Sequence, residues 1–477
     1  MLGTLVKKEI LTNLFSFRFM AAFVLLLIVI PVTVFILTSD GVKRIDDDSL
    51  RRAEIETYLK SFAHFNRLQN IIAPAQPPLP FFSLVRGISS DVNLENFDND
   101  PLPVMFPLID LVFIVSILLS LMALLFSYDS VCGEKEDGTL KLMLANGISR
   151  SQVILGKILG GITTLLVPFL VSLALGLIII LLNPRIGWRG ADWGALGWIL
   201  AGSVLCYTVF YGLGVFVSAR HQASPSSVMT SLFIWVLAVL IIPNLSPYLA
   251  SFLSPAPSQI KIGRQIDRLT DVERDELGRK LQQERTAELF KKYPILAETR
   301  SLSKAQITEL VQRDPAFREA YQALTQEIQR AWDDANRIQN EKANDLRREV
   351  ERKTEAQTRL AKSISIVSPL ADFTYLATDL SSTGIRNQSH FSRIAGIWWQ
   401  SYGEYSRGKI EALQKKDPSL DWWNTAVDVS DMPRFSYREE DLSGRIRGSL
   451  PFFAILMVMI VVVFGAAYIS FIGYDVR

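Results

Sequence analysis

Long apolar runs alternate with long polar runs along the chain, and this segregation dominates the sequence. A helix needs about 20 apolar residues to cross the hydrocarbon core of a bilayer, which is roughly 30 Å thick. Apolar runs of this length favour spanning helices over the buried helices of a soluble protein. The sequence therefore predicts an all-α integral membrane protein with six spans. The predicted spans are Phe19–Leu37, Phe106–Phe126, Gly160–Leu182, Ala195–Val217, Val228–Leu249 and Leu450–Ile472.

Basic residues in the short flanks predict the orientation of these spans. Lysine and arginine are enriched on the cytoplasmic side of membrane helices. The flanks on one side of the predicted bundle carry most of these cations, whereas the short loop 183–194 on the other side carries two. Both chain ends are therefore expected in the cytoplasm. The resulting division is an interface helix at 1–18, span 1 at 19–37, a first outer segment at 38–105, spans 2–5 within 106–249 with a cytoplasmic segment at 128–157, a large and mainly helical extracytoplasmic domain at 251–449, span 6 at 450–472 and a cytoplasmic tail at 473–477.

The apolar spacing in the predicted outer domain is that of helices. Positions three and four residues apart recur from Phe317 onward and predict one continuous helix over Asp314–Ala361. An earlier series that begins at Ile260 predicts a second helix, and Ser303 with Gln306 has the spacing of a capping box. These helices either pair as an antiparallel hairpin or belong to a compact bundle, and the sequence leaves both arrangements open.

Three further helices are expected outside the spans. Ser368 followed by Pro369 predicts a helix start, because proline fits the first turn. Ser389–Leu413 predicts another helix, whose tryptophan pair beginning at Trp398 suits a membrane interface. In the first outer segment, Asp46–Asn70 reads as a helix that a proline-rich linker follows.

Composition and motifs narrow the possible chemistry. The chain has 50 basic and 48 acidic residues, a balance that argues against a nucleic-acid partner. Two cysteines exclude a disulfide framework, and three histidines make a metal site unexpected. A phosphate-binding loop is missing from the sequence, because Ile158 follows Lys157 where such a loop needs serine or threonine. The chain is therefore not expected to be an enzyme or to bind a cofactor itself.

The segment 128–157 between spans two and three is the most informative polar stretch. An acidic turn with Glu134 and Glu136 ends at Gly138, and Thr139 fits the N-cap of a short helix. The apolar side of this helix consists of Leu140, Leu142, Met143 and Leu144. A short amphipathic helix along the membrane surface is a docking surface, whereas the alternative is an ordinary loop between spans.

This segment resembles the signature of the ABC type-2 permeases, the six-span membrane subunits of ATP-driven exporters. The resemblance rests on Glu-x-Glu-x-Gly-Thr-Leu from Glu134 to Leu140, followed by Arg150 and by Gly156-Lys157 ahead of a span. Lys7-Lys8-Glu9 ahead of Arg18 is similar to the amphipathic N-terminal helix of the family. The Ser368-Pro369 helix start and the ending Phe471–Arg477 resemble a subgroup with a large extracytoplasmic domain between spans five and six.

The resemblance implies a division of labour in the inner membrane of a bacterium. A dimer of separate ATPase subunits would bind ATP and magnesium, and two permease chains, identical or paralogous, would form the membrane part. Glu134 and Glu136 would hold the turn or pair with basic ATPase residues, and the leucines would enter an apolar groove of the ATPase. The residues that would couple the two proteins are Glu134, Glu136, Gly138, Thr139, Leu140, Leu142 and Leu144, with Lys7, Lys8, Glu9 and Arg18 of the interface helix beside them.

The sequence says less about the substrate. Charge inside the membrane is often functional, and Asp110 is the one candidate for a substrate path in the predicted spans. Spans with so few charged residues suit the transport of an amphipathic or lipid-linked cargo, or a protein through which nothing crosses the membrane. Three functions remain open: export, a mechanical device whose outer domain acts on a periplasmic partner, and a passive anchor or receptor. A continuous cavity between the spans would favour export, whereas tightly packed spans with a rigid stalk would favour the mechanical device.

Overall fold

The computed structural model describes residues 2–59, 62–64, 68, 72–87, 109–146, 148–300, 302–416 and 425–472. Within these residues the regular secondary structure is helical apart from one antiparallel strand pair, β1 (Phe62–His64) with β2 (Ala426–Asp428). The predicted tail 473–477 and residues 88–108 of the first outer segment lie outside the described residues. The chain divides into two compact units, one of Met1–Pro243 with Ser365–Arg477 and one of Asn244–Ile364.

Six helices of the described part are long and apolar enough to cross a membrane, which confirms the predicted fold class. Each overlaps one predicted span and extends beyond it at one end or both, because polar residues continue the helix past the apolar run. They are α2 (Phe17–Leu59), the series α6 (Leu111–Phe113), η2 (Ile114–Leu119), α7 (Ser120–Ser127) and α8 (Cys132–Glu136), α10 (Arg150–Leu181), α11 (Gly190–Arg220), the series α12 (Ser224–Trp235), η3 (Val236–Ile241) and α13 (Ile242–Leu253), and α20 (Leu442–Ile472).

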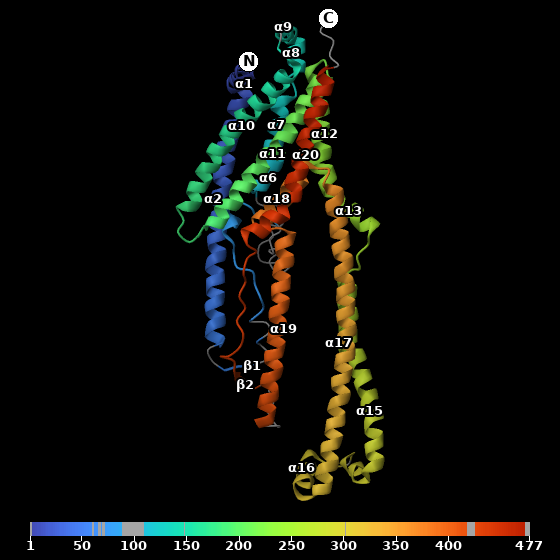
Figure 1. Cartoon of the computed structure of the whole chain (residues 1–477). Helices are drawn as coiled ribbons and strands as arrows, with labels where there is room; N and C mark the ends of the chain where they lie inside the picture. Colours follow the sequence, from blue (N-terminus) through green and yellow to red (C-terminus); the bar gives the residue numbers. More distant parts are fainter. Residues whose placement is uncertain are drawn as a thin grey trace. The chain divides into compact units, whose positions relative to one another are not determined.

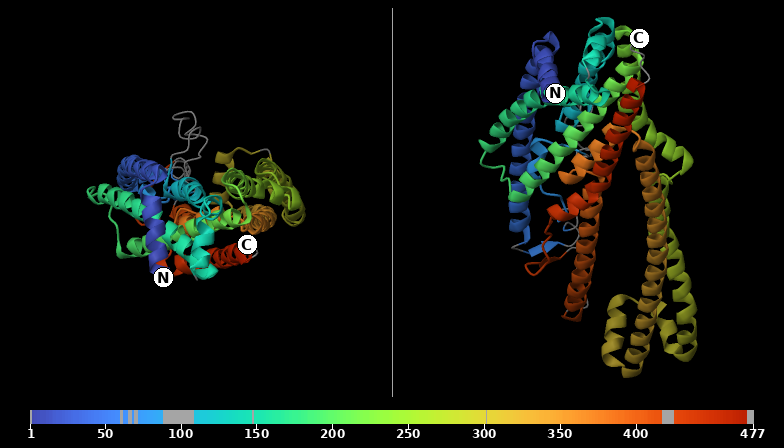
Figure 2. Two further views of the ribbon diagram at one scale, coloured as in Figure 1. Left: turned by 90° about the horizontal axis from the view of Figure 1, so that it is seen from above. Right: turned by 45° about the horizontal axis from the view of Figure 1, so that its top comes forward.

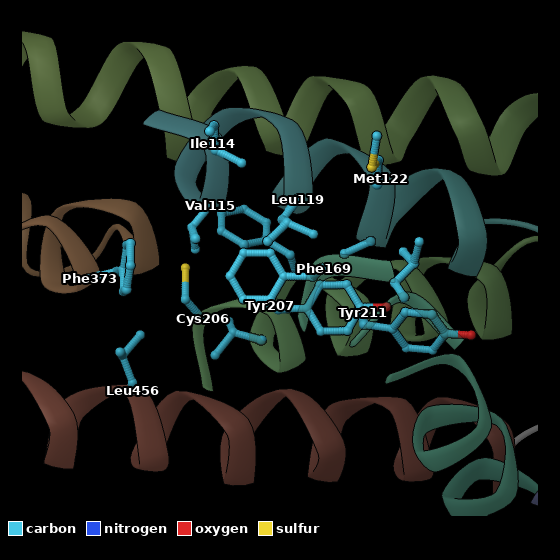
Figure 3. Close-up of a cluster of buried hydrophobic side chains, with 14 of the residues drawn as sticks. Ile114, Val115, Leu119, Met122, Phe169, Cys206, Tyr207, Tyr211, Phe373 and Leu456 are labelled. Atoms are coloured by element: carbon cyan, nitrogen blue, oxygen red, sulfur yellow. The ribbon is translucent and has the colours of Figure 1, made fainter. Parts of the chain in front are cut away.

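Helix α11 is at the centre of the first unit, where it packs against α7, α10, α18 (Pro369–Leu380) and α20 (Figures 1 and 2). Glycines allow α11 to lie close to the neighbouring helices. A Cβ added to Gly161 of α10 would lie 1.9 Å from Cζ of Tyr211, and one added to Gly214 would lie 1.8 Å from Oγ of Ser127. Figure 3 shows Tyr207 and Tyr211 of α11 with other side chains of this apolar core.

The second and fifth spans each contain a π-helical turn. In the fifth span, η3 ends two residues before Pro243, whose ring would clash with the carbonyl four residues earlier in an α-helix. The wider turn removes that clash. In the second span, Ser120 follows η2 and donates its hydroxyl to the carbonyl of Ser116. Trp235 donates from Nε1 to Oγ of Ser120 at 2.9 Å, so the two interrupted helices are tied together beside their π-helical turns.

The first span does not end where its apolar run ends. α2 is one helix of 43 residues, so the predicted span and the helix expected from Asp46 are continuous as far as Leu59. Leu59 packs in a second core with Trp398 of α19 (Ile385–Lys416). Trp398 is 7% exposed and donates its indole N–H to the carbonyl of Pro433 at 3.3 Å. A protein core therefore accounts for the burial of this tryptophan, and its expected place at a membrane interface stays a prediction.

The second unit is an antiparallel helical hairpin. Its first arm consists of α14 (Gln259–Asp267), η4 (Arg268–Glu273) and α15 (Arg274–Lys292) and its second arm of α17 (Pro315–Ser365), with η5 (Pro294–Arg300) and α16 (Lys304–Arg313) between them. Trp332 of α17 packs on Gly278 of α15 and donates to Oε1 of Gln282 at 3.0 Å. The predicted capping box at Ser303 begins α16. Of the two predicted arrangements, the structure has the hairpin for this part of the chain.

Candidate functional site

The turn between the second and third spans has Gly138 where the sequence predicts the turn to end, but the expectation that Thr139 is the N-cap of the short helix is wrong. Gly138 is the N-cap, and the hydroxyl of Thr139 donates to the carbonyl of Glu134 at 3.4 Å. α8 ends at Glu136, and α9 covers Thr139–Ala145. Gly138 between them has a φ angle of 72°, in the left-handed region that costs a glycine little and other residues more. No atom lies within 4 Å of the position that a Cβ would occupy there, so the requirement for glycine comes from the backbone alone.

The N-terminal helix α1 (Leu2–Leu14) lies against α10 on a seat of two glycines. A Cβ added to Gly156 would lie 2.9 Å from Cβ of Leu5, and one added to Gly160 would lie 2.5 Å from Cβ of Glu9. A larger residue at either position would push α1 away. The seat therefore brings Glu9 of α1 up to the side chain that follows Gly156.

That side chain is Lys157, which forms the centre of an ion cluster between three elements. Its Nζ lies 2.9 Å from Oε1 of Glu9 in α1 and 3.0 Å from Oε1 of Glu134 in α8. The side chain of Lys157 is 3% exposed, and those of the two glutamates are 14% and 15% exposed. Lys8 reaches the same oxygen of Glu134 at 2.9 Å from the solvent side. The cluster thus joins residues of the predicted interface helix to one member of the predicted acidic pair.

Two neighbouring charges fasten the turn to two other spans. Lys135 donates from Nζ to the carbonyls of Ala219 at 2.5 Å and His221 at 3.0 Å, at the C-terminal end of α11. Glu136 accepts hydrogen bonds from the amide of Ser224 at 3.0 Å and from its hydroxyl at 2.6 Å, at the start of α12. A cation at a helix C-terminus and an anion at an N-terminus each satisfy backbone groups that the helix leaves open.

Arg18 ties the beginning of α2 to the same face. Its Nη1 lies 2.8 Å from Oδ2 of Asp129, and its Nη2 donates to the hydroxyl of Tyr128 at 2.8 Å. Lys7, on the other hand, is exposed on α1. Arg150 of α10 donates from Nη1 to the carbonyl of Phe471 at 3.0 Å, which brings the end of α20 to this face as well.

The apolar residues of α9 divide between the core and the surface. Leu140 is completely buried, and Leu144 packs partly buried against the same core. Leu142 is 65% exposed, and Gly138 and Thr139 beside it are also exposed. The expectation that the three leucines share one face for a partner does not hold for Leu140. A short helix that lies on the bundle turns one of its sides inward, and Leu140 is on that side.

Asp110, the predicted candidate for a substrate path, is the N-cap of α6. Its Oδ1 accepts from the amide of Phe113 at 2.8 Å, and its Oδ2 accepts from the amide of Arg86 at 3.1 Å. One oxygen thus caps the helix and the other binds the backbone at Arg86, and the role in a path stays a prediction. In the described part of the chain, no group of three histidine, cysteine or acidic side chains is placed to hold a metal ion.

Sequence reasoning misses two buried charges. Lys157 belongs to the motif that carries the family resemblance, but nothing in its spacing shows that it is buried. Its one signal is a lysine inside an otherwise apolar helical run after Gly156. Asp372 of α18 is completely buried, although the sequence places its segment in the outer domain. An aspartate within the apolar run Pro369–Leu380 is the corresponding signal.

These features define a multi-pass helical membrane protein with a short surface helix fastened by buried charges to its N-terminal helix and spans. The chain belongs to the ABC-2 family of transporter proteins, whose sequence profile, "ABC-2 family transporter protein", matches residues 4–476. It is accordingly a membrane permease of the ABC transporter class, as the sequence motif indicates.

Part of this chain is similar to two proteins that are named for a function. The chain is 33% identical over 129 residues to the "Probable ABC transporter permease protein NosY" of Pseudomonas aeruginosa. It is 30% identical over 128 residues to the protein of the same name from Stutzerimonas stutzeri. Each match covers 27% of this chain and 46% of the relative, so the chain spans somewhat less than half the length of these relatives.

Replacing Lys157 by methionine should release α1. The substitution leaves Glu9 and Glu134 buried without their shared cation, and breaking a buried ion pair in this way costs about 3–5 kcal/mol. Backbone amide hydrogen exchange over Leu2–Leu14 should then become at least about tenfold faster. In the control, Lys8→Met removes a cation whose side chain is 45% exposed, and exchange should change by less than about fivefold. Unchanged exchange in Lys157→Met would contradict the clamp.

Proposed function

We propose that the chain is the membrane subunit of an ATP-driven exporter, and that a separate ATPase subunit docks on the face formed by α1 and α9. This face is cytoplasmic in the proposal, in keeping with its lysine and arginine content. The observation that carries the proposal is the mounting of α9. The turn before α9 is fastened to α1, α10, α11 and α12, and yet the side chain of Leu142 is 65% exposed on its outer side.

This mounting gives a physical route for coupling. A partner that binds Leu142 applies force to a turn whose charged side chains are already bound to four other helices. Moving the turn therefore requires these helices to move with it or the buried ion cluster to break. ATP and magnesium bind to the partner ATPase in this proposal, and a second permease chain, identical or similar, completes the membrane part. The names of the two relatives support the assignment for the aligned segment.

The proposal revises the roles of the predicted coupling residues. Leu142 and Thr139 would contact the ATPase, and Gly138 would set the direction of α9. Glu134 and Glu136 hold the turn through Lys157 and Ser224, and are less suited to pair with basic ATPase residues because these contacts already occupy them. Leu140 would support α9 from below without touching the partner.

Replacing Leu142 by glutamate should weaken ATPase docking. The substitution puts a charge in the centre of the proposed apolar contact and removes no buried contact within the chain. We expect co-purification with the ATPase encoded beside this chain to fall by at least about tenfold, since loss of a hot-spot contact costs about 2 kcal/mol or more. The matched control is Leu50→Glu, because Leu50 of α2 is 68% exposed and lies outside the proposed face. Equal loss in both variants would contradict a docking site at α9.

Replacing Gly138 by valine should uncouple the ATPase without unfolding the spans. A residue with a Cβ in the left-handed conformation costs about 1–2 kcal/mol, and a branched one costs more, so α9 should change its direction. Asparagine adopts this conformation readily, and no atom would meet its Cβ. We therefore expect Gly138→Val to bind the ATPase but to lose the permease-dependent change in ATP hydrolysis, and Gly138→Asn to keep it. Full coupling in the valine variant would refute the role of Gly138.

A mechanical output is the second candidate, and two observations favour it. The hairpin Asn244–Ile364 is a compact unit of its own, as a lever acting on a periplasmic partner would be. The small cavity lined by Leu119, Phe169 and Tyr207 among the spans measures about 10 Å³, and so does the one lined by Trp198 and Leu376. Such volumes hold at most one water molecule. Neither cavity resembles a path for cargo in this state of the single chain.

Spin labels can distinguish the two outputs. Labels would be placed at Leu50 of α2 and at Glu309 of α16, both exposed, after Cys132 and Cys206 are replaced by serine. A mechanical device predicts that ATP shifts the distance between the labels by several ångström in the complex with the ATPase. Trp332→Ala, which loosens the hairpin, should then broaden the distribution of distances between the labels while ATP hydrolysis continues. A distance that ATP leaves unchanged rules out the mechanical output and leaves export.

A further inference from the structure

The first turn of α18 is buried inside the first unit. α18 packs against α11, α20 and the π-helical turns η2 and η3. Ser368, its N-cap, donates its hydroxyl to the carbonyl of Ala238 in η3 at 2.5 Å. Cys206 of α11 donates from Sγ to the carbonyl of Pro369 at 3.6 Å. Figure 3 shows Cys206 of α11 and Phe373 of α18 in this region.

Asp372 lies in this turn without a partner for its charge. Its exposure is 0%, and neither carboxylate oxygen has a hydrogen-bond partner within the described residues. The helix N-terminus favours an anion, but this effect is small beside the cost of an ionised carboxylate that is buried without a donor. Burial accordingly raises the pKa of the Asp372 carboxyl to about 8.

The charged groups on the surrounding elements do not compensate Asp372. Arg445 of α20 donates to the carbonyl of Leu380 at the other end of α18, about 12 Å along the helix axis from Asp372. η2 and η3 contain no titratable side chain, and Cys206 of α11 is a neutral thiol that donates to the carbonyl of Pro369. The other titratable groups on elements around α18 have partners of their own or lie elsewhere on the helix. Tyr207 donates to the carbonyl of Gly161, Arg386 pairs with Glu440, and Asp110 accepts from backbone amides. Tyr375 shares a hydrogen bond with Ser365, and Asp379 lies in the last turn of α18.

Asp192 shows what Asp372 lacks. Asp192, at the start of α11, is also 0% exposed. Its Oδ2, however, accepts from the amide of Arg189 at 2.8 Å and lies 3.5 Å from Nε of the same arginine. The two aspartates are equally buried, and the donors and the cation make the difference between them. One carboxylate oxygen of Asp192 thus has a donor and a cation beside it, whereas neither oxygen of Asp372 has a donor, so its surroundings favour the protonated carboxyl.

We propose that Asp372 is a proton-binding site inside the helix bundle, which holds its proton while α18 is packed against α11 and α20 and exchanges it when α18 separates from them. The proton, rather than a metal ion, is the ligand, because no group of three histidine, cysteine or acidic side chains is placed to hold a metal ion in the described part of the chain. The inference rests on the packing of α18 and does not depend on the docking of an ATPase. It makes separation of α18 from the spans a proton-linked step.

Infrared spectroscopy of the full chain in lipid nanodiscs tests this site directly. At about pH 6, ordinary aspartates are ionised, and a buried protonated carboxyl gives a separate C=O band. We expect Asp372→Asn to remove one such band and the matched variant Asp192→Asn to leave the spectrum in that region unchanged. Identical spectra for Asp372→Asn and the parent protein would overturn the proposal, as would loss of the band in Asp192→Asn alone.

A second measurement needs no folded Asn variant of Asp372. Aspartate labelled with 13C at its carboxyl carbon shifts the band, and raising the pH should remove the shifted band well above the range of a solvated aspartate.

Where Asp372→Asn does fold, its stability relative to the parent should rise with pH. The folded parent retains the proton that its unfolded chain loses, so its folding equilibrium weakens by up to about tenfold per pH unit between about pH 4 and pH 8. A pH-independent difference in stability would contradict proton binding.

Discussion

A single ammonium group, the Nζ of Lys157, holds three elements of the permease together. Burying a lone lysine charge costs several kcal/mol, and two carboxylates at about 3 Å offset that cost only if both are present. Removing the ammonium group or one of the carboxylates therefore leaves a buried charge without its partner. α1 needs the glycine seat to bring Glu9 close, and α8 needs the second span to end where it does to bring Glu134 close. The order of the whole α1–α9 face follows from satisfying this one cation.

The sequence predicts the parts of this structure that depend on local patterns. Apolar runs locate the spans, and the spacing of Ser303 with Gln306 locates a helix start, because hydrophobic burial and capping act over a few residues. The turn at Gly138 follows from the same kind of reasoning, whereas α9 begins one residue earlier than an N-cap at Thr139 would allow. Helix ends in the polar regions are harder to predict. α2 continues to Leu59 because its polar part packs on a second core that residues near Trp398 complete from far along the chain.

The candidate site is less predictable for the same physical reason. Which leucine of α9 faces outward depends on the helix's orientation on the bundle, and no periodicity within seven residues fixes that orientation. The partners of Lys157 lie in α1 and α8, at sequence distances that a single sequence does not relate. Asp372 is the clearest example, because its burial results from helices contributed by three distant parts of the chain. Buried charge in this protein is a property of the assembled bundle.

The unbroken helix α2 has a geometric consequence. Its 43 residues give a rod about 65 Å long, which begins beside α1 and ends in the second core. Pro31 interrupts its hydrogen bonding, but Ile30 and Val34 are buried on either side and hold that turn in place. A tilt of only about 5° at the Phe17 end would carry Leu59 through an arc of about 6 Å, since displacement grows with rod length. A small rotation of the first span at one end thus becomes a larger displacement at the other, and the strand pair and α19 would be the parts that move with it.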